Sequence, residues 1–172
     1  MARRKLQLPI SFEQIMQRHE REIMRYLLRM SGNRADAADL FQETWLRAYR
    51  AYPRLKPESD VRPWLYAIAL NLSRNRARDG ARRTRVIVPE DQKNPAAIRK
   101  SGGHRALDEN DGYAAVQLRD LMSALPARQR QAVHLRYFAG LDYSGIAAAM
   151  NCSQDNARAN VSQALKKLRA MW

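Results

Sequence analysis

Residues 125–147 read LPARQRQAVHLRYFAGLDYSGIA, and a polar break at residues 151–153 separates them from a basic segment that ends at Trp172. Two short segments and a tight turn therefore lead into a longer segment rich in Asn, Arg, Gln and Lys. Asp142 and Ser153 suit the position before a helix, because their side-chain oxygens accept hydrogen bonds from free backbone N–H groups. This pattern is typical of a helix-turn-helix, in which the last helix enters a DNA groove.

Two stripes divide the last predicted helix. Apolar residues recur every three or four positions and are expected to face the core; they are Ala157, Val161, Leu165 and Leu168. A second stripe is predicted to face the groove; it holds Arg158, Ser162 and Lys166, with Ala159 and Gln163 alongside. A helical hairpin that binds protein would have a similar pattern, so that alternative stays open.

Charge and composition narrow the classes of function. The 172 residues carry 31 basic and 17 acidic side chains, and the net charge of +14 favours a polyanionic partner. Of the basic residues 25 are Arg, whose guanidinium group binds phosphates and base edges with two parallel hydrogen bonds, as Lys does not. GC-rich coding would also enrich Arg. The only cysteine, Cys152, rules out an internal disulfide and a cysteine-rich zinc site. We interpret it as a small residue that packs the turn rather than as a redox switch.

Apolar runs are short everywhere in the sequence. None approaches the roughly 20 residues that span a bilayer, and the basic start is followed by too few apolar residues for a signal peptide. We therefore expect a cytoplasmic protein.

The charge is unevenly distributed, which suggests three parts. Residues 1–88 carry 19 basic against 9 acidic side chains, residues 89–112 carry 4 against 5, and residues 113–172 carry 8 against 3. The middle part has many helix breakers and few large apolar residues, so it is predicted to be a flexible linker. The flanking parts have helical periodicity, and only the run 86–88 suggests a strand. We expect an all-α protein with two small helical domains.

An acidic stripe marks the predicted helix from Asp36 to about Tyr52. Asp36, Asp39 and Glu43 occur at i, i+3 and i+7 and share one face, with Gln42 beside them. Such a stripe in a strongly basic chain invites a basic partner. Acidic groups near a helix start also complement the helix dipole, and the spacing alone leaves that explanation open. Metal binding is disfavoured, because no His or Cys lies near in sequence.

A polar stripe marks the segment from residue 60 to residue 85, where Pro63 suits the first turn of a helix. Its members fall at i, i+3, i+4 and i+7; they are Asn71, Arg74, Asn75 and Arg78. Asn can read a base edge and Arg neutralises phosphate, so this face is predicted to bind nucleic acid. Trp64 either packs in the core or stacks on unpaired bases.

Together these segments resemble bacterial RNA polymerase sigma factors of the short extracytoplasmic-function (ECF) class. Three motifs occur in the family's order: DAADLFQETWLRAY at 36–49, RPWLYAIALN at 62–71, and the helix-turn-helix at 125–168. The resemblance covers nearly the whole chain and includes a linker where the family has one. It implies a sigma-2-like helical bundle over 1–88, a linker over 89–112 and a sigma-4-like helix-turn-helix domain over 113–172.

The resemblance also implies a role for each polar surface. The first motif would dock on the clamp coiled coil of core RNA polymerase through Asp39, Leu40, Gln42 and Glu43. The second would melt and read the −10 promoter element, with Asn71 and the loop 55–61 holding a flipped base; its contacts would be Trp64, Asn71, Arg74, Asn75 and Arg78. The third would read the −35 element through Arg136, Arg158, Ala159, Ser162, Gln163 and Lys166.

Partners follow from the same resemblance. They would be core RNA polymerase, promoter DNA and an anti-sigma factor, often membrane-anchored, that clamps the two domains; no small-molecule substrate, cofactor or metal is implied. The chain departs from the family at Gly145, where members often have Glu, and Gly inside a helix costs roughly 1 kcal/mol relative to Ala. The start of the last helix, residues 155–159, also departs, so the base preferences of the family are not carried over.

Three other functions compete with this interpretation. A conventional helix-turn-helix repressor or activator would bind duplex DNA without polymerase, and it leaves the acidic stripe unexplained. A nuclease would need Asp36, Asp39 and Glu43 around a metal, and the sequence offers no further ligands placed to complete that site. An anti-sigma-like adaptor would bind protein but not promoter DNA.

Overall fold

The computed structural model describes residues 10–87 and 113–172, with side chains described for residues 10–80 and 117–172. The regular structure of these ranges is helical throughout, which confirms the all-α prediction. The expected linker over residues 89–112 lies outside the described residues. The suspected strand at residues 86–88 is wrong for its described part, because α3 continues through Ile87.

Local capping sets the ends of the first two helices. α1 spans Phe12–Ser31 and begins with a capping box in which Ser11 and Gln14 satisfy each other's backbone N–H groups. It ends at Gly32, whose positive φ of 75° suits glycine. α2 spans Arg34–Ala51 and begins at Asn33, whose side chain accepts a hydrogen bond from the backbone of Asp36. The helix predicted from Asp36 to about Tyr52 is therefore present and starts two residues earlier.

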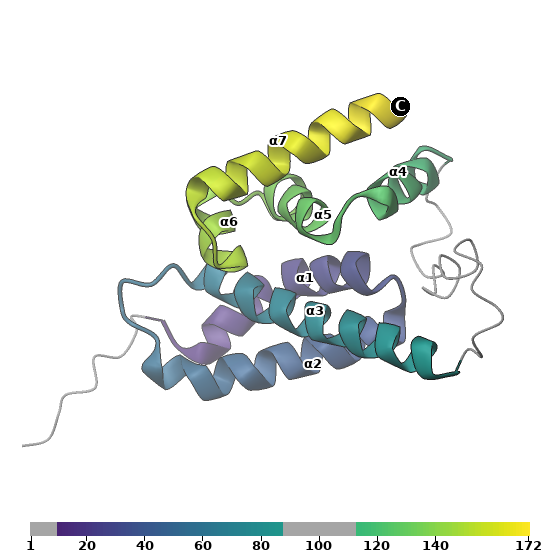
Figure 1. The fold of residues 1–172 in the computed structure, drawn as a ribbon. Coiled ribbons are helices and arrows are strands. Elements are labelled where there is room, and N and C mark those ends of the chain that lie inside the picture. The colour runs from purple at the N-terminus through teal and green to yellow at the C-terminus, as the bar shows by residue number, and fades with distance from the viewer. Residues whose placement is uncertain (1–9, 88–112) are drawn as a thin grey trace, which may run out of the picture.

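The third helix is the longest of the described elements. A short 3₁₀ turn, η1 at Tyr52–Arg54, and a loop lead into α3, which spans Val61–Ile87. Pro63 lies in the first turn of α3, where its missing N–H is tolerated. In Figure 1, α1, α2 and α3 form one layer of packed helices.

The C-terminal half supplies four shorter α-helices. α4 spans Tyr113–Ala124, α5 spans Ala127–Val133, and a π-helical turn, η4 at His134–Phe138, continues α5. α6 spans Tyr143–Met150 and α7 spans Gln154–Met171; as predicted, Asp142 caps the first and Ser153 caps the second. Asn151 adopts a left-handed φ of 50° between them, which makes the tight turn of the helix-turn-helix.

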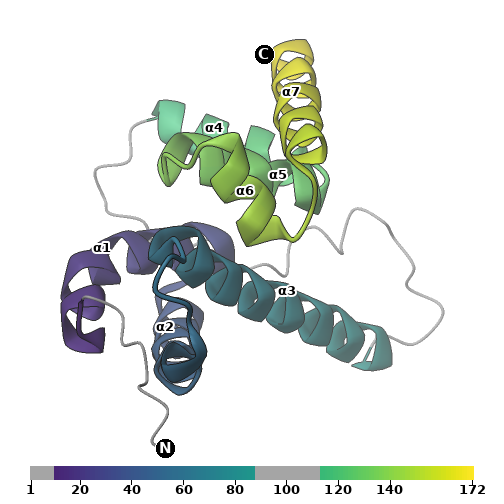
Figure 2. The same ribbon diagram turned by 90° about the vertical axis from the view of Figure 1, so that its left-hand side faces the viewer.

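The two halves share one hydrophobic core. In Figures 1 and 2 the C-terminal helices lie against one side of the α1–α3 layer, and the main contact between the halves is that of α6 with α3. The shared cluster includes fully buried side chains from both halves: Ile15, Ile23, Leu27, Leu65, Leu70, Leu135, Ile146 and Val161. Burial of each such side chain contributes about 1.5–3 kcal/mol. A smaller cluster inside the C-terminal half contains Met122, Leu125, Val133 and Ala164.

Candidate protein and nucleic-acid interfaces

The acidic stripe of α2 lies largely on the surface. The side chains of Asp39 and Glu43 are 64% and 40% exposed, and Gln42 is exposed beside them. Leu40 is different, because only 5% of it is exposed and it packs in the core. In this arrangement Leu40 packs α2 into the bundle, while Asp39, Gln42 and Glu43 lie at the surface, where a partner can reach them.

Arginines cover part of the acidic stripe. Arg76 of α3 pairs with Asp36 and, at 3.2 Å, with Asp39, whereas Arg47 donates to Glu43 at 2.6 Å. The hydrogen bond from Asn33 and the pairing with Arg76 hold the pKa of Asp36 below its usual range, against a smaller effect of burial. Exposed ion pairs contribute only about 0–1 kcal/mol, so a basic partner can replace these arginines at little expense.

The polar stripe of α3 divides into exposed and covered members. Asn71, Asn75 and Arg78 are exposed, and Arg78 donates to the side-chain oxygen of Asn75. Arg74 is half-buried and donates to the Gln131 side-chain oxygen from Nε at 3.0 Å and from Nη2 at 2.7 Å. The structure therefore brings three of the four predicted residues to the surface and ties the fourth to the C-terminal half.

Burial and charge both act on Arg74. Desolvation and the nearby positive charge of Arg128 lower its pKa, and its printed hydrogen bonds reach an amide rather than a carboxylate. Trp64, the other residue predicted for this surface, is half-buried and packs against the shared core. Its position favours the packing alternative.

The predicted groove-facing stripe of α7 is open to solvent. Arg158, Ala159, Ser162, Gln163 and Lys166 are all exposed, and Ala157, Val161 and the unpredicted Ala164 are the buried residues opposite them. Leu165 and Leu168 are half-buried, as expected for a core-facing side. The division of this helix into two faces is therefore as predicted.

Tyr143 organises two cations at the start of the helix-turn-helix. The guanidinium groups of Arg136 and Arg158 lie 4.9 and 5.1 Å from the centre of its ring, within the range of cation–π attraction. Arg136 also donates to the Leu141 carbonyl at 3.0 Å. The sequence pattern does not single out Tyr143, which is the first residue of α6 and directly follows its capping residue Asp142. Its ring holds two predicted DNA contacts side by side.

A partly buried polar network lies where α1 meets α3. Arg62 donates to Glu22 at 2.7 and 3.0 Å, His19 donates to the same carboxylate at 2.5 Å, and Tyr66 donates at 3.2 Å. Burial raises the pKa of Glu22, but hydrogen bonds and charge from His19 and Arg62 outweigh it and lower the pKa to about 2. Sequence patterns give no sign of this network, because Arg62 and Tyr66 of α3 lie 40 and 44 positions after Glu22 of α1.

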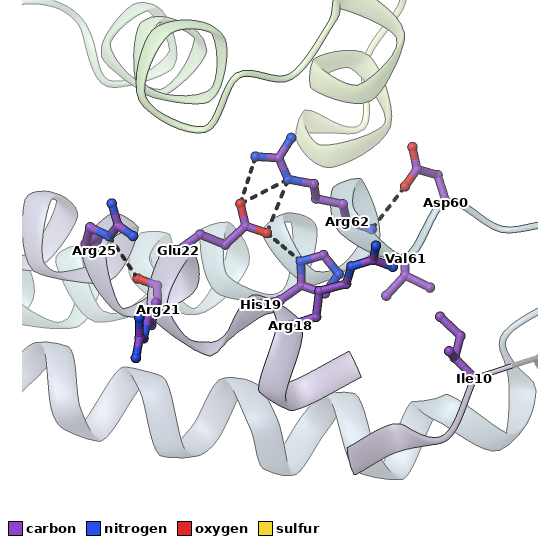
Figure 3. Close-up of a pocket in the computed structure, with 9 residues that line it drawn as sticks. All are labelled: Ile10, Arg18, His19, Arg21, Glu22, Arg25, Asp60, Val61 and Arg62. Atoms are coloured by element: carbon purple, nitrogen blue, oxygen red, sulfur yellow. Dashed lines mark hydrogen bonds and ion pairs between the residues drawn. The ribbon is translucent and has the colours of Figure 1, made fainter. Parts of the chain in front are cut away.

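The same network borders a surface hollow of about 620 Å³. Figure 3 shows Arg62 above Glu22, with helices of the C-terminal half passing over its guanidinium group. The hollow is lined mainly by charged side chains; beside Glu22 and Arg62 it has Ile10, Arg18, His19, Arg21, Arg25, Asp60 and Val61.

Neither a metal site nor a membrane-spanning helix is found among the described residues. Among residues 10–87 and 113–172, no three His, Cys, Asp or Glu side chains gather as a metal ion would require. Asp36 and Asp39, which the nuclease alternative needs, point to Arg76 instead. The same search of described residues finds no helix with the length and apolarity needed to cross a membrane.

Two family models match the chain. Sigma-70 region 2 matches residues 15–83, which cover α1 to most of α3. Sigma-70, region 4 matches residues 115–168, which cover most of α4 to α7. The two matches fall inside the expected divisions at 1–88 and 113–172.

Curated relatives are similar over almost the whole chain. RNA polymerase sigma factor CarQ of Myxococcus xanthus is 30% identical over 161 residues, which are 94% of this chain and 88% of that protein. RNA polymerase sigma-H factor of Pseudomonas aeruginosa is 28% identical, over 90% of this chain and 82% of that protein. ECF RNA polymerase sigma factor SigM of Bacillus subtilis is 27% identical, over 95% of this chain and 96% of that protein.

Solved structures share the fold. The sigma factor RpoE of Bartonella quintana, solved with the anti-sigma factor NepR, gives a TM-score of 0.70 at 21% identity, over 92% of this chain and 94% of that one. CnrH, solved with the cytosolic domain of CnrY, gives a TM-score of 0.66 at 19% identity, over 93% of this chain and 86% of that one.

Proposed function

The chain belongs to the sigma-70 family as an ECF sigma factor, a factor that binds core RNA polymerase and directs promoter-specific initiation, and we propose that it does so through three surfaces. The division we propose is residues 1–88 for polymerase binding and the −10 element, 89–112 as linker, and 113–172 for the −35 element. The observation that carries the proposal is an exposed acidic stripe on α2 in a chain of net charge +14.

The α2 surface is proposed to bind the clamp coiled coil of the polymerase's largest subunit. Asp39, Gln42 and Glu43 offer two carboxylates and an amide on one exposed face, which complements a basic helix. Leu40 would contribute indirectly: it is buried in the core, and this packing holds α2 in the orientation that exposes the acidic face. Arg76 and Arg47 would exchange their surface ion pairs for those of the partner.

The α3 surface is proposed to follow the non-template strand of the −10 element. Asn71, Asn75 and Arg78 are exposed on one side, with an amide for a base edge and a guanidinium for phosphate. The resemblance gives Asn71 and the loop 55–61 the task of holding a flipped base. Extrusion of a base costs a few kcal/mol, so contacts of the flipped base with its pocket and stacking surface must offset that free energy. Arg74 would join this surface once Gln131 releases it.

The helix-turn-helix is proposed to read the −35 element. Arg158, Ala159, Ser162, Gln163 and Lys166 form the exposed side of α7, and Tyr143 holds Arg136 next to Arg158. This face combines phosphate-binding cations with small and amide side chains that reach base edges.

Regulation is proposed to come from an anti-sigma factor, which is membrane-anchored in many members of the family. Two proteins of similar fold, RpoE of Bartonella quintana and CnrH, were each solved with a protein partner, NepR or CnrY. We further propose that the chain acts in the cytoplasm, without a cofactor and without catalysing a reaction itself.

Reconstitution with bacterial core RNA polymerase and a library of randomised promoters tests this function. The wild type is expected to select a promoter class and start transcripts at a fixed distance from it. Asn71→Ala should keep its affinity for core polymerase but lose discrimination at the −10 element. Asn160→Ala is the matched control, because Asn160 lies on α7 and its side chain donates to the Asn156 carbonyl. Tight duplex binding with no polymerase-dependent initiation would favour the repressor or activator alternative.

A further inference from the structure

Two buried glutamines of α5 form hydrogen bonds with different helices. Gln131 accepts from Arg74 of α3, whereas Gln129 donates from Nε2 to the Oε1 atom of Gln163 on α7 at 2.9 Å. Gln129 is only 9% exposed, and α5 packs against α7 in Figure 1. A buried side chain of α5 therefore contacts one of the residues predicted to read the −35 element.

The hydrogen bond restrains which atoms of the Gln163 amide face outward. A glutamine amide has an acceptor on one atom and two donors on the other. The acceptor of Gln163 is turned toward Gln129, and among the described residues its Nε2 atom has no acceptor. Because Gln163 is exposed, its NH2 group is the part of the amide that is left for a DNA base.

Burial favours the persistence of this hydrogen bond. The Oε1 atom of Gln129 is also buried and has no partner among the described residues, so the bond to Gln163 is the one that satisfies this amide. A buried amide that loses its last partner is left without either protein or water, which is unfavourable. A glutamine without such a partner would turn its amide freely and could offer either atom to a base.

We propose that Gln129 is a positioning residue for promoter recognition, which holds Gln163 so that its NH2 group faces the DNA and selects a base with an acceptor. This inference rests on the proposed role of α7 at the −35 element. In the major groove guanine and thymine offer acceptors, whereas the exocyclic amino group of cytosine is a donor. Adenine is read by both atoms of a glutamine amide, so a restrained Gln163 loses one of the two contacts. Gln163 is therefore assigned to guanine or thymine.

Promoter selection by the holoenzyme tests this assignment, with a library randomised upstream of the −10 element. The holoenzyme is reconstituted from bacterial core RNA polymerase and the full-length chain. Gln163→Ala identifies the base pair that this side chain contacts, because the preference at that pair alone should disappear. There the wild type is expected to favour guanine or thymine over cytosine by about tenfold, as for one good contact with a base edge.

Substitutions of Gln129 should change that preference without touching DNA. Gln129→Glu keeps the size of the side chain but replaces its NH2 donor with a carboxylate, which only accepts hydrogen bonds. Gln163 must then turn its own NH2 group inward, and the preference should reverse toward cytosine or adenine by about tenfold. Gln129→Leu removes the hydrogen bond and should admit adenine without favouring cytosine. Gln117→Glu is the matched control, because it makes the same change at an exposed position of α4 and should leave every preference unchanged.

A double variant separates positioning from a merely structural role. If Gln129 acts through Gln163, adding Gln129→Glu to Gln163→Ala should change no base preference further. Circular dichroism checks that the helices of each variant persist. The proposal is contradicted if a folded Gln129→Glu keeps the wild-type preference, or if Gln163→Ala loses none. A wild type that selects no upstream sequence would instead overturn the −35 role itself, a result distinct from a selected sequence that ignores Gln129.

Discussion

The two helices predicted to bind DNA differ in how freely the chain presents them. On α7 the predicted residues are exposed along the whole stripe, from Arg158 to Lys166. On α3 one predicted residue, Arg74, is hydrogen-bonded to Gln131, and another, Trp64, is half-buried against the core. The two helices have the same kind of polar stripe in the sequence, so periodicity alone does not decide whether a stripe is accessible; contacts with distant segments do.

The largest expected effect concerns the shared core. Ile146 is fully buried in the cluster that joins the halves, and Ile146→Ala should lower the free energy of unfolding by about 2–5 kcal/mol. Leu46→Ala, at a side chain of α2 that is 43% exposed, is the control and should change stability little. Urea unfolding followed by circular dichroism and tryptophan fluorescence should give one coincident transition. Two separate transitions would mean that the halves are independent.

The next effect concerns Glu22, which supports the Arg62 contact. Its pKa of about 2 lies below the ordinary value of 4.5, so its stabilisation is fully present above pH 4.5 and is lost as the pH falls toward 2. Glu22→Gln should therefore lower the free energy of unfolding by up to about 3 kcal/mol at neutral pH and by little near pH 2. Chemical denaturation at several pH values measures this; a constant difference across the range would contradict the role of the charge.

His134 should govern stability at a higher pH. Burial, together with the charges of Arg29 and Arg130, lowers its pKa from 6.5 to about 4. A base with a lowered pKa destabilises the fold as the pH falls from 6.5 to 4, by about 2 kcal/mol at pH 5. His134→Leu should remove this part of the pH dependence. Thermal unfolding of both chains between pH 7 and pH 4 checks it, and parallel curves would refute the assignment.

The smallest effect separates the two DNA surfaces most directly. Lys166→Ala should reduce the slope of log affinity for duplex DNA against log salt by about 0.9, because one exposed phosphate contact is lost. Arg74→Ala should leave that slope nearly unchanged in the free chain, because Gln131 already holds Arg74. Anisotropy titrations at four salt concentrations would distinguish them. Equal changes of slope would show that Arg74 is as available as Lys166.

Local signals in the sequence were sufficient for most of the fold. Asp142 and Ser153 cap their helices through bonds to residues three positions later, and the two faces of α7 follow from a spacing of three or four residues. Such short spacings can be identified in the sequence alone. The start of α2 was placed two residues late because Asn33, also a good cap, stands before a polar first turn. Val86 and Ile87 suggest a strand because both are β-branched, but in the structure they form the last turn of α3.

The relation between the halves could not be predicted in this way. The bonds of Arg74 to Gln131 and of Arg62 to Ala139 join residues 57 and 77 positions apart, and no periodicity reports such pairs. Gly145 was noticed as a costly residue, but its reason, Pro63, lies 82 positions earlier in the chain. The acidic stripe was identified correctly as one face, whereas the burial of Leu40 and the pairing with Arg76 depend on packing.

The central claim is that α2 binds core RNA polymerase through its acidic stripe. Its most direct test is the affinity of purified bacterial core polymerase for a fluorescently labelled chain, measured for the wild type, Glu43→Lys and Glu20→Lys. Glu20 is an exposed glutamate of α1, so its reversal changes the net charge equally. We expect the wild type and Glu20→Lys to bind alike and Glu43→Lys to lose at least about thirtyfold in affinity, as for truncation of a buried interfacial charge pair. Equal binding by all three chains would contradict the account.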